Sequence, residues 1–185
     1  MPKQNDTGER VSWSSESLFD RVVQRCALIL LLILLLAPGL EAAGNSAPKP
    51  GARDKCPVCG MLVAGFANWA STIVFKDGSH IFFDGPKDMF KYLLDLKRYN
   101  SSKQPGDIEA IFVTDYYKVV SIDGRKAWYV VGSDVLGPMG DEIVPMEKES
   151  DARAFMKDHK GKKILTFQEV TPDIIKGLDS SRDRR

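Results

Sequence analysis

Residues 71–96 read STIVFKDGSHIFFDGPKDMFKYLLDL, and this stretch determines the predicted fold class. Two runs rich in β-branched and aromatic residues, 71–75 and 80–83, flank the pair Asp77-Gly78. An Asp-Gly pair between such runs predicts a β-hairpin, because the turn needs positive backbone φ angles. The apolar residues in the second half of the stretch recur at helical spacing. The stretch therefore predicts a hairpin followed by a helix.

The start of this helix is predicted from its local residues. Asp84-Gly85-Pro86 provides a plausible N-cap in Asp84, with Pro86 in the first turn. A strand-like run at 110–114 follows the helix. This half of the chain therefore has the predicted order β-β-α-β.

A second copy of the pattern follows. Runs at 118–122 and 127–131 flank Asp123-Gly124, which again predicts a hairpin. A helix is expected to begin near Ser150 and to lead to another strand. The second half therefore also has the predicted order β-β-α-β.

The predicted fold is α+β, with two repeated β-β-α-β lobes packed together. A lobe of about 50–60 residues buries too little surface to be stable by itself, so we expect the lobes to share a core. The alternative is a single α+β domain in which the repetition is coincidental. The predicted organisation is a signal peptide or N-terminal anchor at 1–43, a flexible linker at 44–54, a first lobe at 55–114, a second lobe at 115–177 and a disordered tail at 178–185.

Composition excludes several classes of protein. The 185 residues are 43% hydrophobic and 28% charged, with a net charge of +1, which is a globular profile without the basic surplus of a nucleic-acid-binding protein. Three cysteines and two histidines are too few for a framework of several disulfides or for a histidine-rich metal cluster.

The N-terminal region predicts export. Residues 27–37 read ALILLLILLLA, an apolar run shorter than the roughly 20 residues of a membrane-spanning helix. Arg21 and Arg25 precede the run and small residues follow it, which is typical of a secretory signal peptide. Cleavage is expected between Gly39 and Ala43. An uncleaved signal that anchors the protein to the membrane is the alternative, and both place the folded part in the periplasm or outside the cell.

The motif CPVCGM at 56–61 carries the clearest chemistry. A c-type haem site needs His directly after the second Cys, where this chain has Gly60. A zinc site would need further ligands, such as His80 or His159 with carboxylates. A thioredoxin-type motif precedes a long helix, and no helical pattern follows Cys59. A local disulfide also remains open, because exported proteins fold in oxidising surroundings.

Copper(I) is the ion that suits the sulfur-bearing residues of this region. It is soft and prefers thiolate and thioether ligands. Met61 lies two residues beyond Cys59, and Met139 lies in the run GPMG, which indicates an exposed turn rather than a core face. Met139 as an apolar anchor beneath its loop is the alternative. His80 is a further candidate ligand, although a strand histidine is most often a surface residue.

Catalytic motifs are absent from the sequence. It contains no Gly-x-Ser-x-Gly elbow, phosphate-binding loop or dinucleotide fingerprint. A nucleophile pair of Cys59 and His80 would lack an orienting group and oxyanion donors. The sequence therefore predicts a binding protein and not an enzyme.

Three segments together resemble the NosL family, the accessory proteins of nitrous oxide reductase. They are CPVCGM, DGSHIFFDGPKDMFKYL and GSDVLGPMGDEIVPM, and the resemblance covers residues 55–170. It implies a two-lobed β-β-α-β fold akin to one domain of organomercurial lyase. It also implies binding of Cu(I) and its delivery to a copper enzyme, nitrous oxide reductase, through an ABC-type membrane complex.

The resemblance also implies roles for individual residues. Cys59 and Met61 correspond to the end of the motif nearest the metal, Met139 to the distal ligand, and Cys56 to a further member of the site. The family's lipoprotein signal ends in a small residue followed by Cys. Here Cys26 precedes the apolar run, and no other Cys occurs before Cys56, so no site for lipid attachment is expected.

Two other functions remain open at this level. An exported thiol–disulfide oxidoreductase would use Cys56 and Cys59. A scaffold in which the same two residues form a structural disulfide would need neither Met139 nor a metal.

Overall fold

The computed structural model describes residues 23–25 and 47–182, without the side chains of residues 181 and 182. The apolar run at 27–37 and its expected cleavage site lie outside the described residues. Among the residues that are described, no helix is long and apolar enough to cross a membrane. Within the described part of the chain, residues 47–182 form one compact unit.

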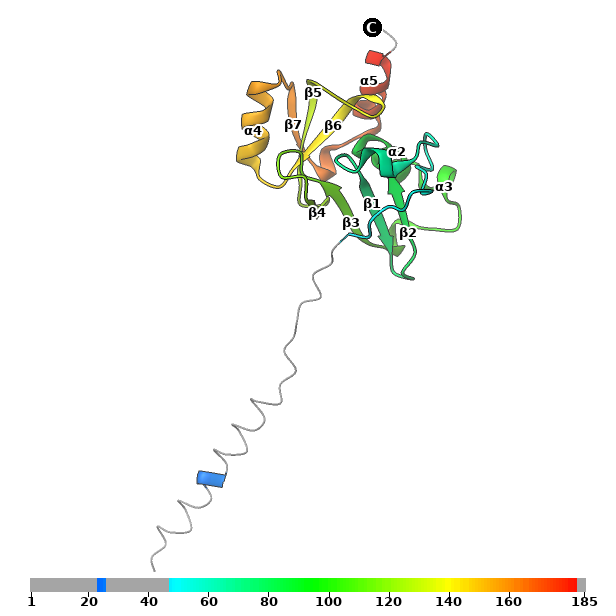
Figure 1. Ribbon diagram of the computed structural model, residues 1–185, viewed down its shortest axis with the longest axis vertical. Coiled ribbons are helices and arrows are strands. Elements are labelled where there is room, and N and C mark those ends of the chain that lie inside the picture. The colour runs from blue at the N-terminus through cyan, green and yellow to red at the C-terminus, as the bar shows by residue number, and fades with distance from the viewer. Residues whose placement is uncertain (1–22, 26–46, 183–185) are drawn as a thin grey trace, which may run out of the picture. The chain divides into compact units, whose positions relative to one another are not determined.

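The first half of this unit is a four-stranded antiparallel sheet with two helices. Its strand order is β2-β1-β3-β4. The elements are β1 (Ser71–Phe75), β2 (His80–Phe83), α2 (Pro86–Leu94), α3 (Leu96–Tyr99), β3 (Ile108–Thr114) and β4 (Ser121–Asp123), with short 3-10 helices η1 (Val63–Phe66) and η2 (Pro105–Asp107) (Figure 1).

The second half is a three-stranded antiparallel sheet of order β6-β5-β7. Helix α4 packs against this sheet (Figure 1). The elements are β5 (Trp128–Gly137), β6 (Gly140–Met146), α4 (Glu149–Asp158), β7 (Lys163–Thr166), η3 (Phe167–Glu169) and α5 (Pro172–Arg182).

The predicted hairpin at Asp77-Gly78 is confirmed. Strands β1 and β2 pair antiparallel, with Val74 opposite His80. Gly78 has a φ of 81°, the left-handed conformation that such a turn requires. The hairpin is followed by α2 and then by β3, so the first half has the expected β-β-α-β order.

The hairpin predicted at Asp123-Gly124 is wrong. Strand β4 pairs with β3 in the first sheet, whereas β5 pairs with β6 and β7 in the second. Gly124 donates its N–H to the Ile111 carbonyl, and a Cβ at Gly124 would lie 2.8 Å from Ile111 Cγ2. This glycine therefore permits close packing on β3 and does not close a hairpin.

The hairpin of the second half is β5–β6. Gly137 pairs with Gly140 across a two-residue turn made of Pro138 and Met139, and Gly140 has a φ of 86°. The second β-β-α-β unit is therefore β5-β6-α4-β7, one strand later than predicted. The α+β class and the order of elements in each half are as expected.

The two sheets share one hydrophobic core. Buried residues of the first sheet and α2 join those of the second sheet in a single cluster. Phe90 on α2 packs edge-to-face on Tyr129 of β5, with ring centroids 5.2 Å apart. Helix α2 thus contacts strands of both sheets, which brings its first turn to the junction between the two halves.

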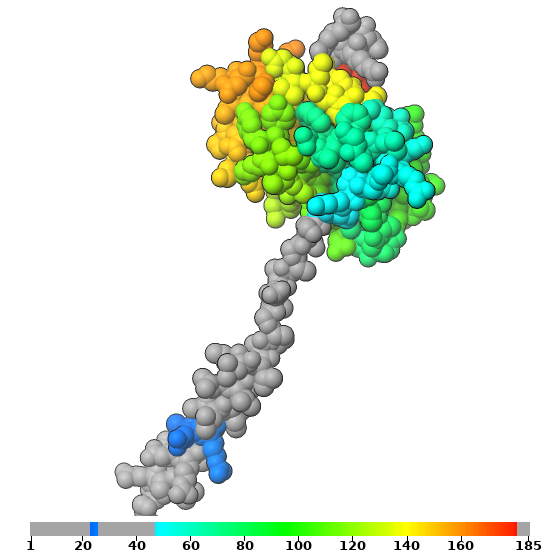
Figure 2. Space-filling view, viewed as in Figure 1, coloured from blue at the N-terminus to red at the C-terminus, as the bar shows by residue number. Residues whose placement is uncertain are grey.

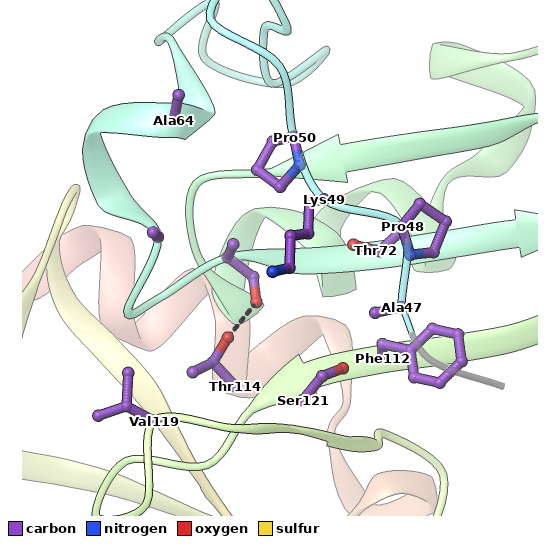
Figure 3. Close-up of a pocket in the computed structure, with 12 residues that line it drawn as sticks. Ala47, Pro48, Lys49, Pro50, Ala64, Thr72, Phe112, Thr114, Val119 and Ser121 are labelled. Atoms are coloured by element: carbon purple, nitrogen blue, oxygen red, sulfur yellow. Dashed lines mark hydrogen bonds between the residues drawn. The ribbon is translucent and has the colours of Figure 1, made fainter. Parts of the chain in front are cut away.

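Two terminal stretches take part in the folded unit. Residues 47–50, within the expected linker, line a pocket of ≈ 390 Å³ together with Thr72, Thr114 and Ser121 from the first sheet (Figure 3). Helix α5 extends to Arg182, so it includes the first residues of the stretch that was expected to be a tail. Leu178 of this stretch is buried.

Candidate metal centre

A tight loop presents the two cysteines. An isolated β-bridge between Lys55 and Leu62 closes the loop. Inside it, Cys56 N–H donates to the Met61 carbonyl at 2.9 Å, and Gly60 N–H donates to the Cys56 carbonyl at 2.9 Å. Gly60 has a φ of 80°, so a residue with a side chain would be strained here. These backbone bonds hold residues 56–61 in one fixed conformation.

The start of helix α2 lies against this loop. Gly85 is the N-cap residue and Pro86 the first helical residue, so Pro86 lies in the first turn as expected. The N-cap predicted at Asp84 is wrong, and Gly85 makes no side-chain cap. Asp84 is fully buried, one residue before the cap, and Asp88 is buried in the first turn.

The loop and the helix bring four potential ligands together. Cys59 Sγ donates to Asp84 Oδ1 at 3.3 Å, and Cys56 Sγ donates to Asp88 Oδ2 at 3.4 Å. One ligand atom from each of the four residues lies within 4.8 Å of the others. Cys56 is only 1% exposed, while Cys59 is half-buried. The group is therefore accessible from the side of Cys59.

Two carboxylate oxygens in this group have no hydrogen-bond donor among the described residues. They are Asp84 Oδ2 and Asp88 Oδ1. Lys91 Nζ lies 3.5 Å from Asp88 Oδ1 and is also paired with Asp179 at 2.8 Å. A buried polar atom without a donor is unfavourable, so such atoms call for a physical explanation. A cation at the centre of the group is one that suits the ligand set.

Burial keeps both cysteines in the thiol form. It raises the pKa of the Cys59 thiol to about 12, with hydrogen bonds to the Asp88 and Asp84 carboxylates adding to the effect. Burial also raises the pKa of the Cys56 thiol, again with contributions from both carboxylates. Backbone hydrogen bonds oppose these increases at both residues. Each thiol is therefore a proton donor to a neighbouring carboxylate until a metal displaces the proton.

Met139 lies in the β5–β6 turn, which is fixed to the first turn of α2. Lys87 is 1% exposed, and its Nζ donates to the carbonyl oxygens of Met139 at 3.0 Å and of Asp141 at 2.7 Å. Lys87 directly precedes Asp88 in the chain. In Figure 2 the part of the surface that contains α2 lies directly beside the yellow β5–β6 hairpin. The backbone of the methionine turn is thus held beside the cysteine–aspartate group.

Glu142 on β6 also connects the second sheet to the first turn of α2. Its Oε1 accepts from Lys87 N–H at 2.7 Å and from Ile143 N–H at 3.0 Å. The first contact satisfies an N–H in the first helical turn, which has no partner within its own helix. Burial raises the pKa of the Glu142 carboxyl to about 7. A side chain of the second sheet therefore caps a helix of the first half.

The candidate ligands chosen from the sequence lie in three places, of which the β5–β6 turn with Met139 is one. Cys56, Cys59 and the half-buried Met61 belong to the loop itself. His80 is exposed at the start of β2, with its ring against Phe82, four residues before Asp84. Four residues of extended strand span about 13 Å, so the structure does not bring His80 into the group.

Sequence reasoning missed Asp84 and Asp88 as candidate ligands. Their signal is the run DGPKD, in which two carboxylates flank a Gly-Pro helix start. Asp84 has the sequence pattern of a helix cap, and Asp88 resembles any acidic residue in a first helical turn. Only the packing of the cysteine loop on the helix makes them neighbours of sulfur.

The pocket of ≈ 390 Å³ is a separate feature. Lys49 points into it from the N-terminal segment, and Thr114 donates to the Ala70 carbonyl at its edge (Figure 3). Its lining residues include neither sulfur nor carboxylate groups. It therefore has no soft or anionic ligand for a metal ion.

Comparison with known proteins gives concordant matches. The NosL family model matches residues 48–175. The copper-binding lipoprotein NosL of Stutzerimonas stutzeri is 29% identical over 161 residues, which cover 78% of this chain and 80% of that protein. The crystal structure of the copper chaperone NosL from Shewanella denitrificans has a TM-score of 0.57 and 27% identity, covering 69% of this chain and 96% of that one. The solution structure of apo-NosL from Achromobacter cycloclastes is 26% identical, with a TM-score of 0.41 over 57% of this chain and 87% of that one.

Proposed function

Since this chain belongs to the NosL family, we propose that it is an exported protein that binds Cu(I) and carries it to a copper enzyme. The observation that carries the proposal is the convergence of Cys56 and Cys59 at the start of α2, beside the turn that holds Met139. Two relatives are named as a copper-binding lipoprotein and a copper chaperone, which supports the same class of function.

In this proposal sulfur atoms hold the copper. The thiolates of Cys56 and Cys59 are the main ligands, and the thioethers of Met61 and Met139 complete the set. Cu(I) is a soft ion that favours these donors over imidazole or carboxylate. His80 is left out of the set because it lies at the opposite end of β2 from Asp84.

The surroundings of the cysteines suit a carrier. Copper replaces the thiol protons, and the adjacent Asp84 and Asp88 accept hydrogen bonds from those thiols before it arrives. The N-terminus of the nine-residue helix α2 favours negative charge on the ligands. Because Cys59 is half-buried, a partner's ligand can approach the metal from that side and exchange for one of the carrier's own.

The proposed destination is a periplasmic copper enzyme such as nitrous oxide reductase, or its ABC-type maturation complex. The apolar run at 27–37 supports export. One relative is named a lipoprotein, but this sequence has no Cys between Ala27 and Lys55 for lipid attachment. Membrane anchoring of this chain would therefore depend on the apolar run itself.

A thiol–disulfide oxidoreductase is the second candidate function, because Cys56 and Cys59 have the spacing of redox-active pairs. The protonation of the site argues against it. Reactive cysteines have lowered pKa values, whereas burial raises the pKa of both thiols here. We therefore propose a binding protein and not an enzyme.

The test is an anaerobic titration of the reduced full-length protein with Cu(I) against a chromogenic Cu(I) chelator. Variants Cys59→Ser and Met139→Ala are compared with the parent and with Met156→Leu, a conservative change on α4 away from the site. We expect the parent and Met156→Leu to withdraw copper from the chelator and the other two to lose most of that capacity. Failure of the parent to compete would exclude copper carriage, and parental binding by Met139→Ala would remove Met139 from the ligand set.

A further inference from the structure

We propose that the pocket of ≈ 390 Å³ on the outer face of the first sheet binds a carboxylate that carries a small apolar group. Such a carboxylate can belong to a free acid or to the C-terminus of a peptide, which share the same chemistry. The pocket has no residue in common with the proposed copper site. The inference therefore goes beyond copper binding and does not depend on it.

The floor of the pocket is formed by alternate residues of the first sheet. Thr72 on β1 pairs with Phe112 on β3, and Thr114 on β3 pairs with Ser121 on β4. The neighbours of these residues along each strand belong to the hydrophobic core, so the four side chains lie on the face opposite the core. Thr72, Phe112 and Thr114 are nevertheless at most 9% exposed. Other segments of the chain therefore cover this face, and the pocket lies beneath them.

The polar groups of the pocket favour an anion. Lys49 extends from the N-terminal segment into the space that Thr114 and Ser121 also line (Figure 3). The Lys49 ammonium forms no ion pair with any described residue, and the hydroxyl groups of Thr72 and Ser121 form no hydrogen bond to one. Among the described residues that line the pocket, none has a carboxylate. One ammonium and two available hydroxyl donors suit a single carboxylate.

The rest of the lining suits an apolar group attached to that carboxylate. It consists of small or apolar side chains, namely Ala47, Pro48, Pro50, Ala64, Ala67, Ala70, Phe112 and Val119. The volume lies in the range of small-molecule sites, which combine apolar walls with a few polar groups. A short alkyl chain or one apolar amino-acid side chain is therefore the expected companion of the carboxylate.

The conformation of Val119 supplies a second, independent observation. Its φ is 54°, in the left-handed region that a β-branched residue rarely adopts. Val119 N–H donates to the Asp115 carbonyl at 2.9 Å, and Asp115 N–H donates to the Val120 carbonyl at 2.8 Å, so the turn fixes this conformation. Strained residues of this kind are concentrated at sites that bind ligands. Val119 is 50% exposed and lines the pocket, so contact with a ligand explains its side chain better than core packing does (Figure 3).

Four small molecules test the chemistry of the ligand. Hexanoate represents a free acid, and N-acetylglycyl-leucine represents a peptide C-terminus. Hexanol has the chain without the charge, and inorganic phosphate has the charge without the chain. Each is titrated into isotope-labelled, metal-free full-length protein, and the NMR signals of the Thr72, Thr114 and Ser121 amides report binding at the pocket. We expect saturable shifts of these signals with at least one of the two acids, and the acid with the smaller dissociation constant identifies the source.

The charge of Lys49 is tested by Lys49→Met, which keeps an apolar stem and removes the ammonium. We expect the dissociation constant of the preferred acid to rise by about fivefold or more, and that of hexanol to stay unchanged. For the parent protein, hexanol and phosphate should each bind at least about fivefold more weakly than that acid. Lys97→Met, at an exposed position on α3, is the matched control and should bind the acid like the parent.

Val119→Asn separates a role in binding from a role in the fold. Asparagine adopts the left-handed conformation more readily than valine but lacks its apolar surface. We expect weaker binding of the acid, while the free energy of unfolding is no lower than that of the parent. A variant that lost stability and kept parental binding would show that Val119 serves the fold, and it would contradict this part of the proposal.

The remaining outcomes are decisive for the site as a whole. Equal dissociation constants for hexanol and hexanoate, or parental binding of the acid by Lys49→Met, would overturn the carboxylate site. Tighter binding of phosphate than of either acid, or unshifted signals at all three reporter amides, would do the same. Cys59→Ser should bind the acid like the parent, because Cys59 does not line the pocket. Failure of the copper proposal would therefore leave this one intact.

Discussion

The Lys87 ammonium donates to the Met139 carbonyl at 3.0 Å, so a buried residue in the first turn of α2 holds the turn that carries the methionine. Lys87 belongs to the half of the fold with the first sheet and Met139 to the half with the second sheet. The two residues are 52 positions apart in the chain. This contact links the cysteine–aspartate group to the β5–β6 hairpin. The proposed copper site depends on this link, because the link holds the turn of Met139 at the start of α2.

Replacement of Lys87 by Met tests the link. The change removes the charged donor to the Met139 and Asp141 carbonyls and the 3.6 Å ion pair with Asp179, and loss of a hydrogen bond to a charged group costs about 1.5–3 kcal/mol. We expect a lower free energy of unfolding in denaturant titrations and weaker Cu(I) binding. Lys97→Met, at an exposed position on α3, should change neither quantity. Unaltered copper affinity in folded Lys87→Met would show that the link does not position Met139.

Glu142 predicts how stability depends on pH. Its pKa is about 7 in the folded protein against an ordinary value of 4.5, because burial disfavours the charged carboxylate. The folded state therefore holds the proton more tightly, and the stabilisation is present below about pH 4.5 and is lost as the pH rises through 7. At about 1.4 kcal/mol per pKa unit, this residue lowers the free energy of unfolding by about 3 kcal/mol across that range.

Glu142→Gln is the variant that isolates this contribution. Its amide oxygen can still accept from Lys87 N–H but does not titrate. Denaturant titrations from pH 4.5 to 8 should show a shallower decline in the free energy of unfolding for the variant than for the parent. Identical slopes in the two proteins would contradict the raised pKa.

The raised thiol pKa predicts slow alkylation. The pKa of Cys59 is about 12 against an ordinary value of 9.0, so its thiolate fraction near pH 8 is lower by about a thousandfold than that of an unperturbed thiol. A more basic thiolate is also a better nucleophile, so reaction of Cys59 with iodoacetamide in the metal-free protein should be slower by about one to two orders of magnitude, and reaction of the buried Cys56 slower again. Mass spectrometry of protein quenched at intervals measures both rates.

Asp84→Asn should accelerate this reaction at Cys59. The substitution removes a carboxylate that accepts from the thiol and favours its protonated form. The exposed Asp95→Asn serves as its control. Rapid alkylation of the parent at neutral pH would instead favour the oxidoreductase function.

Gly140 predicts a backbone requirement in the β5–β6 turn. Its φ is 86°, and a Cβ there would have no heavy atom within 4 Å. Gly140→Ala therefore tests conformation without steric overlap, and we expect it to lower the free energy of unfolding by about 1–2 kcal/mol. Because the strain falls beside Met139, Cu(I) affinity should also decrease. Gly106→Ala, in similarly open space but without a left-handed φ, is the control for stability.

Local signals in the sequence determined several parts of this protein. Asp77-Gly78 specified a hairpin, because its turn needs a left-handed residue whatever surrounds it. Pro86 specified the first turn of α2, since proline fixes φ and lacks the N–H that is unpaired there. The CPVCGM run specified a pair of sulfurs held close together. Each of these depends on residues within a few positions of one another.

The tertiary structure decided the rest, because it depends on contacts between distant segments. Asp123-Gly124 has the same two residues as the Asp77-Gly78 turn. Its glycine, however, is needed for packing against Ile111 and not for a hairpin. Asp84 has the sequence of a cap, but the cysteine loop, 25 residues earlier in the chain, lies against it and makes it a neighbour of Cys59. Local patterns describe the geometry that a segment prefers, whereas the neighbours of a buried carboxylate are set by the way the segments pack.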